Sequence, residues 1–167
     1  VGDDAFGHLL VETMGKAGIE TRGIVADPSV FTTLAFVSLT PEGERSFSFA
    51  RKPGADTRLT WGEVDRTLID EARVFHFGTL SLTDEPSRAA TRQAVDYAKG
   101  RGKRITFDPN LRLPLWPDED AARKQILWGL AQADVVKISE GEVDFLWRCG
   151  YWEGAERLLT EFGVGLA

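Results

Sequence analysis

Residues 104–112 read RITFDPNLR, a short strand pattern followed by a polar end. The run ITF favours a β-strand, and Pro109 ends it, because proline has no amide hydrogen to give to a neighbouring strand and disfavours helix in the residue before it. Ligands bind at the C-terminal ends of the strands in open parallel α/β sheets. A carboxylate, an amide and a guanidinium together suit a polyol or a phosphate. The sequence Asp-Pro-Asn is also common in ordinary turns. Both interpretations can hold. The polar residues that we predict at this end are Asp108, Asn110 and Arg112.

Two further strand patterns flank this one along the chain. Residues 74–77 (VFHF) are mostly apolar and stop at Gly78, and residues 134–138 (DVVKI) run into Ser139. Helical patterns separate the strands, and this alternation predicts a parallel sheet with right-handed crossovers. Parallel strands end at one edge of a sheet, so we predict a cleft there. Its predicted lining is Thr79, Asp108, Asn110, Arg112, Ser139 and Glu142.

Polar residues that precede apolar helical runs predict where the helices begin. Thr60 and Glu63 form a capping-box pattern ahead of one run. Thr83 or Asp84 is expected to cap the next helix, which we expect to pack through its alanines. Asp118 is expected to cap the helix that follows residues 104–112.

Ser139-x-x-Glu142 is a second capping-box pattern, directly after the third predicted strand. As a cap, it satisfies two amide groups at the start of a helix. A helix N-terminus also attracts phosphate, and a glutamate beside it can order a water molecule bound to Mg²⁺. Both roles stay open at this point.

Residues 31–51 combine two β-rich runs, TTLAFVSL and SFSF, around a Pro-Glu-Gly turn that contains Glu42. This pattern predicts an antiparallel hairpin inserted into the α/β order, with Phe47 and Phe49 on one face. Inserted hairpins of this kind act as lids or as dimer contacts. Either both rings pack on the main body, or Phe49 and Arg51 close over a ligand.

The composition is that of a single globular domain. The chain has 167 residues, of which 43% are hydrophobic and 28% charged, enough for one core. A net charge of −6 argues against nucleic acid or an anionic membrane as a partner, and no apolar run is long enough to cross a bilayer. The single cysteine, Cys149, excludes a disulfide within the chain and favours the cytoplasm.

Because the chain starts at Val1 and ends on a strand-like GVGLA, we expect both ends to be cut.

Several sequence blocks, in this order, resemble the PfkB (ribokinase-like) family of carbohydrate kinases, and within it the bacterial fructokinases. Each block is weak alone, and their joint occurrence is specific. The blocks are VGDDAFG (1–7), LAFVSL with GERSFSF (34–49), FHFGTLSL (75–82), FDPNLR with LPLW (107–116) and ADVVKISEGEVDFL (133–146).

The resemblance implies a ribokinase-like α/β fold, in which a parallel sheet in a three-layer arrangement carries an antiparallel hairpin as a lid. It also implies that residues 1–167 are a partial domain, incomplete at both ends. It implies ATP-dependent, Mg²⁺-assisted phosphorylation of a sugar's primary hydroxyl, fructose to fructose 6-phosphate, by a homodimer formed through the lid. By similarity, the sugar contacts are Phe49, Arg51, Thr79 and Arg112. The ATP contacts are Asp108, Asn110, Arg112 and Ser139, and Glu142 acts on Mg²⁺ through water.

The chain also departs from the family pattern. The catalytic base of the family is an aspartate in a Gly-Ala-Gly-Asp motif, and no such motif occurs here. The N-terminal substrate aspartate and the Gly-Gly-x-x-x-Asn segment are missing too. We therefore expect no catalytic residue in this chain and no activity from it alone. The alternatives are another kinase of the family, for ribose, 2-keto-3-deoxygluconate or a nucleoside, and a catalytically dead module that binds nucleotide or sugar.

Overall fold

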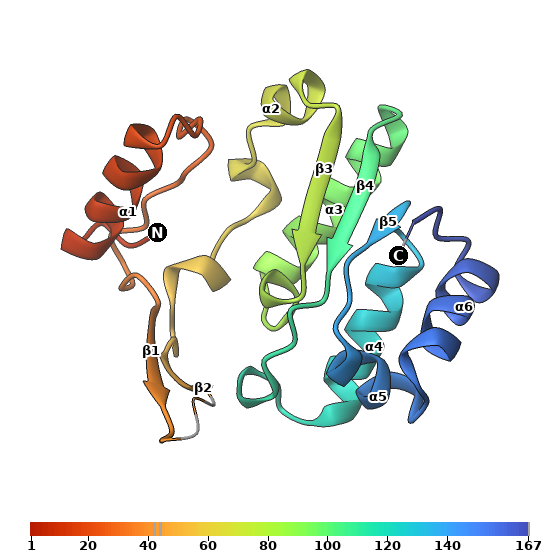
Figure 1. Ribbon diagram of the computed structural model, residues 1–167. Coiled ribbons are helices and arrows are strands. Elements are labelled where there is room, and N and C mark those ends of the chain that lie inside the picture. Colours follow the sequence, from red (N-terminus) through yellow and green to blue (C-terminus); the bar gives the residue numbers. More distant parts are fainter. Residues whose placement is uncertain (42, 44, 167) are drawn as a thin grey trace.

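The computed structural model describes residues 1–41, 43 and 45–166. The first third of the chain forms helix α1 (Ala5–Lys16) and a hairpin of β1 (Leu34–Leu39) and β2 (Arg45–Ala50), which stand beside the main sheet instead of joining it (Figure 1). Short elements lead from the hairpin to the main sheet. They are the 3-10 turns η1 (Ala55–Thr57) and η2 (Trp61–Glu63) and helix α2 (Arg66–Glu71).

The main sheet is parallel, with β4 at its centre. It consists of β3 (Val74–Gly78), β4 (Arg104–Asp108) and β5 (Val135–Val136), in the order β3-β4-β5. Gly78 stands opposite Asp108, and Phe107 stands opposite Val136. The C-terminal ends of the strands therefore lie at one edge, which confirms the predicted arrangement.

The core lies between the sheet and the two long helices, α3 (Ser87–Gly100) and α4 (Glu119–Leu130). On β4, Ile105 and Phe107 are each 1% exposed, and burying such a side chain is worth about 1.5–3 kcal/mol. The expected alanine face of α3 is buried. Helices α5 (Glu140–Trp147) and α6 (Tyr151–Glu161) lie on the β5 side (Figure 1). Among the described helices, none is both long and apolar enough to span a bilayer.

The predicted hairpin is confirmed. Its register pairs Ala35 with Phe49 and Val37 with Phe47, and the two phenylalanine rings stack with their centres 6.1 Å apart. Both rings therefore lie on one face, as the alternating pattern predicts. Glu42, in the predicted turn, lies outside the described residues.

The predicted helix start at Thr60 is wrong, although its capping box forms. The Glu63 carboxylate accepts hydrogen bonds from the amide and hydroxyl groups of Thr60, at 2.8 and 2.6 Å. The turn that they enclose ends after Glu63, because Val64 is extended. Helix α2 begins after Asp65, whose side chain accepts from the amide of Thr67. By contrast, Asp118 caps α4 as predicted.

The Asp4 carboxylate both caps α1 and ties it to the approach of the hairpin. It accepts hydrogen bonds from the amides of Phe6 and Gly7 at 2.9 Å, and from the amide of Thr32 at 2.7 Å. These donors, the Thr32 amide foremost, lower the pKa of Asp4 from 3.8 to about 2.

The lowered pKa makes a contribution to stability that depends on pH. Because the folded pKa lies below the unfolded one, the ionised carboxylate stabilises the folded chain above pH 3.8, and this contribution is lost as the pH falls through about 2. Asn also caps helices well, so Asp4→Asn tests the charge. We expect Asp4→Asn to lower the Tm near neutral pH, and we expect the Tm difference to shrink as the pH falls from about 4 and to disappear below about pH 2. A difference that is independent of pH would contradict this.

Gly129 allows α4 to pack closely on β4. A β-carbon at position 129 would lie 2.4 Å from the Phe107 ring, so Gly129→Ala should lower the free energy of unfolding by about 1–3 kcal/mol, measured by urea denaturation. The control is Gly15→Ala in α1, where a β-carbon meets no atom within 4 Å. It should be neutral or stabilise by up to about 1 kcal/mol. Equal effects of the two substitutions would refute this account of the packing.

Candidate functional site

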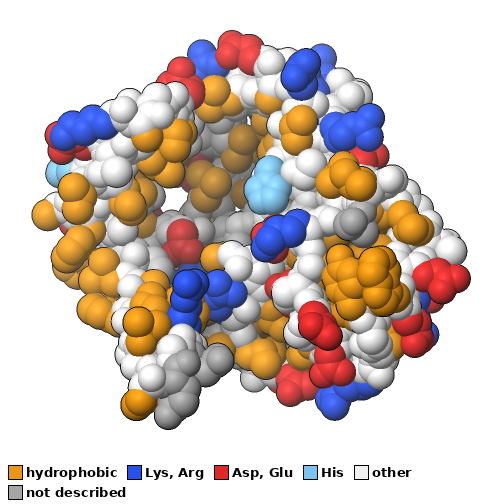
Figure 2. Space-filling view, in the orientation of Figure 1, with side chains coloured by type: hydrophobic (Ala, Val, Ile, Leu, Met, Phe, Trp, Pro, Cys, Tyr) orange, Lys and Arg blue, Asp and Glu red, His pale blue; other side chains and the backbone are white. Residues whose placement is uncertain are grey.

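A cleft of about 640 Å³ lies at the C-terminal edge of the main sheet. Its walls come from the loop after β4, the start of α5 and the hairpin strand β2. Figure 2 shows basic side chains on both sides of the hollow between the hairpin and the sheet. Of the predicted lining residues, the structure brings together Asp108, Asn110, Arg112, Ser139 and Glu142.

Thr79, the remaining predicted lining residue, lies outside this cleft. It borders a neighbouring hollow of about 300 Å³, and the residue as a whole is 0% exposed. Its hydroxyl and amide groups both donate to the carbonyl of Pro109. Thr79 therefore holds the loop after β4 against the end of β3, and its predicted contact with a sugar stays a prediction.

Asp108 shapes the loop and positions a lysine that sequence reasoning missed. One of its carboxylate oxygens accepts from the amide of Asn110 at 3.1 Å, and the other accepts from Nζ of Lys137 at 2.7 Å. This hydrogen bond with Asp108 raises the pKa of Lys137. The signal for Lys137 was its register: it follows Val136, which pairs with Phe107, so it stands beside Asp108.

Glu142, which is 8% exposed as a residue, joins two walls of the cleft through its carboxylate. One oxygen accepts from the amide and hydroxyl groups of Ser139 at 2.8 Å, which forms the predicted capping box. The other oxygen accepts from the amide of Leu111 at 2.8 Å, in the loop after β4. Sequence reasoning predicted the cap, but the bond to Leu111 was not foreseen.

The donor set of the cleft fits a phosphate better than a metal ion. Arg45, Arg112 and Lys137 line it, and α5 begins beside it, so cationic and N–H donors converge. Both Glu142 oxygens already accept from protein donors, and the described residues contain no group of three His, Cys, Asp or Glu side chains that could hold a metal. Mg²⁺ would fit here only through water.

A second cavity, of about 860 Å³, adjoins the cleft on the side of α1 and the hairpin. Phe49 and Arg51 line it, and Phe47 and Pro114 line both cavities. The structure therefore separates the predicted lid-side sugar contacts from the predicted ATP contacts. Phe47 stands on the wall between them, and the guanidinium carbon of Arg112 lies 4.8 Å from the centre of its ring.

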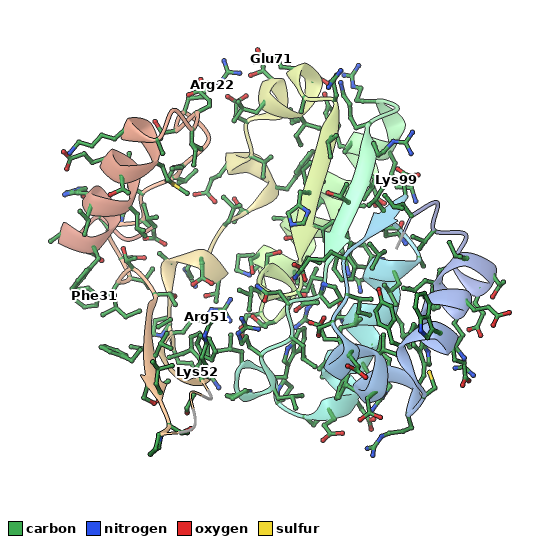
Figure 3. All side chains as sticks on the ribbon, viewed as in Figure 1. Arg22, Phe31, Arg51, Lys52, Glu71 and Lys99 are labelled. Carbon is green, nitrogen blue, oxygen red and sulfur yellow. The ribbon has the colours of Figure 1, made fainter. Side chains whose placement is uncertain are left out.

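Arg51 reaches from the end of the hairpin into the protein (Figure 3). Its side chain is 5% exposed. The guanidinium donates to Asp56 and Thr83 at 2.7 Å, and to the Leu80 carbonyl at 2.7 Å, with the Asp84 carboxylate at 3.6 Å. A buried arginine needs such partners. The prediction that Thr83 or Asp84 caps α3 is wrong, because the cap position is Pro86, without a side-chain hydrogen bond, while Thr83 and Asp84 contact Arg51. The predicted contact of Arg51 with a sugar stays a prediction.

Sequence comparison identifies the family. The model described as pfkB family carbohydrate kinase matches residues 1–153. "Probable fructokinase-7" of Arabidopsis thaliana is 47% identical over 148 residues, which is 87% of this chain and 43% of that protein. "Fructokinase-2" of Oryza sativa subsp. japonica is 48% identical over 145 residues, which again is 87% of this chain and 43% of that protein. The chain thus spans less than half the length of these curated relatives.

Comparison with solved structures leads to the same family. The crystal structure of fructokinase from Xylella fastidiosa matches with a TM-score of 0.82 and 33% identity, over 99% of this chain and 51% of that one. Fructokinase from Vibrio cholerae O395, in its form with fructose, ADP and calcium, matches with a TM-score of 0.87 and 30% identity. The match covers 98% of this chain and 53% of that one. The predicted resemblance to fructokinases is confirmed, and it extends to plant as well as bacterial members. On its sequence and its fold, the chain belongs to the pfkB family of carbohydrate kinases.

Proposed function

We propose that this chain is the central part of an ATP-dependent sugar kinase that converts fructose to fructose 6-phosphate. The relatives with 47–48% identity are named fructokinases, and a matching structure carries fructose and ADP. The observation in this molecule that best supports the proposal is the pair of adjoining cavities. One is lined by cations at the strand ends, and the other lies under the hairpin.

ATP, when bound, supplies the phosphoryl group, and the cleft supplies charge and orientation. In this proposal Arg112 and Lys137 neutralise the phosphates, while the side chains of Asn110 and Ser139 lie beside them. Asp108 contributes by holding Lys137 in place. Phosphoryl transfer depends largely on such positioning and charge neutralisation. Glu142 would act on Mg²⁺ through bound water and not directly, because both of its carboxylate oxygens already accept hydrogen bonds within the protein.

The sugar is assigned to the cavity beneath the hairpin. Phe49 lines this cavity and offers an apolar ring to one face of the sugar. Arg51 fixes the stem of the hairpin through Asp56 and Thr83, and so sets the position of Phe49. In this proposal Thr79 acts on the sugar indirectly, through the loop that it holds, and Arg112 stands between the two substrates.

The group that takes the proton of the sugar hydroxyl is proposed to come from outside these residues. Residues 1–167 contain no Gly-Ala-Gly-Asp sequence, which in the resemblance carries the base. Loss of general-base catalysis costs about 10²–10⁴ in rate. The chain by itself is therefore proposed to bind ligands without turning them over. The whole protein is proposed to work in the cytoplasm, as the single cysteine favours.

The enzymatic proposal predicts the effect of Arg112→Gln in a protein that joins this chain to the Gly-Ala-Gly-Asp part of the family domain. We expect ADP release that depends on fructose, and a loss of roughly 10²-fold in kcat/KM for ATP in the variant, because a cation is removed from the transferring phosphates. The control is Arg104→Gln, an exposed arginine at the opposite end of β4, which should have no effect.

Other outcomes decide between the alternatives. Higher kcat/KM for ribose, 2-keto-3-deoxygluconate or a nucleoside than for fructose would replace the proposed substrate. Nucleotide binding without turnover of any sugar would favour a binding module. Fructose-dependent ADP release from the 167-residue chain alone, abolished by Arg112→Gln, would disprove the proposal that the base lies elsewhere.

The whole protein is proposed to be a homodimer formed through the hairpin. Phe36 on β1 is 60% exposed, as expected for a residue that a second subunit covers. Sedimentation equilibrium should give twice the monomer mass, and Phe36→Asp should shift it toward monomer. The matched control, Leu159→Asp on α6, changes a residue that is 52% exposed and lies away from the hairpin. A monomeric mass for the unmodified protein would rule the dimer out.

A further inference from the structure

Phe47 joins the hairpin to the cleft at the point where the two cavities meet. Its half-buried ring projects from β2, on the same face as Phe49. The guanidinium carbon of Arg112 lies 4.8 Å from the centre of this ring, a distance that favours a cation–π interaction. A residue of the lid therefore contacts a cation that the site provides for phosphate.

The contact with the ring leaves the donors of Arg112 available. A guanidinium is planar, and its N–H groups point outward in that plane, so its face can rest on a ring while its edges bind an anion. Among the residues that the structure describes, one hydrogen bond is found for the Arg112 guanidinium, to the carbonyl of Leu111 at 2.9 Å. Arg51 differs, since its guanidinium donates to Asp56, Thr83 and the Leu80 carbonyl.

Arg112 is thus held from two sides. Its acceptor, Leu111, is itself tied to α5 because its amide donates to Glu142 at 2.8 Å. On the other side, the guanidinium lies against the ring of Phe47. Arg45 precedes Phe47 by two residues, which places it on the same face of β2, and it lines the same cleft. The lid therefore presents both a ring and a cation to this cleft.

We propose that Phe47 is a positioning residue for anion binding: its ring orients Arg112 so that the free N–H groups meet an oligophosphate in the cleft. The lid then contributes to the phosphate side of the site as well as to the sugar side. This inference rests on the proposed function and deepens it.

The test is calorimetric titration of the 167-residue chain with sodium tripolyphosphate at low ionic strength. Phe47→Leu keeps an apolar side chain but removes the aromatic face, and it should weaken binding about three- to fivefold. Phe47→Trp should bind at least as tightly as the unmodified chain, because indole is the best cation–π partner. The control is Phe36→Leu, the same change on the opposite face of the hairpin, since Phe36 pairs with Ser48. It should leave the affinity unchanged, and thermal melting checks the fold of each variant.

Three results overturn the inference: unchanged affinity in Phe47→Leu, an equal loss in Phe36→Leu, or weak binding by Phe47→Trp. Arg112→Gln separates this failure from failure of the proposed function. If the unmodified chain binds tripolyphosphate and Arg112→Gln does not, the phosphate site stands, whatever Phe47→Leu shows. If the unmodified chain does not bind tripolyphosphate, both the proposed phosphate site and the proposed role of Phe47 are wrong.

Discussion

The parallel pairing of β4 with a strand on each side sets where the side chains of the site lie. Because β3 and β5 run in the same direction as β4, the residues that follow all three strands come out at one edge. The paired strands pack on α4 through Phe107, which is buried there, and Gly129 leaves room for its ring. A core contact thus places Asp108 and Lys137 side by side.

The loop after β4 keeps its shape through contacts with segments that are distant in the chain. Thr79 donates to the Pro109 carbonyl from the end of β3, and Glu142 accepts from the Leu111 amide at the start of α5. Neither side chain points into the cleft as a free group. Both side chains hold the loop that carries Asn110 and Arg112, and rigid support of this kind is what binding sites need.

The hairpin meets the main body through two arginines with different roles. Arg51 is buried and uses its donors within the protein, so it fixes the stem of the hairpin. Arg112 lies against Phe47, and among the described residues its guanidinium donates to the Leu111 carbonyl alone, so its other donors can meet a ligand. The difference comes from burial: a guanidinium enclosed by protein must satisfy its donors there, whereas one at a cleft need not.

The sequence by itself determined the strands, their parallel order, the hairpin and the caps at Asp118 and Ser139, because these depend on local periodicity and on short-range hydrogen bonds. The resemblance to the family came from the same local blocks. Only the tertiary structure decided that the hydroxyl of Thr79 and the guanidinium of Arg51 point into the protein, and that Lys137 joins the cleft. Such choices depend on which donor meets which acceptor between segments far apart in the chain. Local pattern does not encode those pairings, because they exist only once the core has brought the segments together.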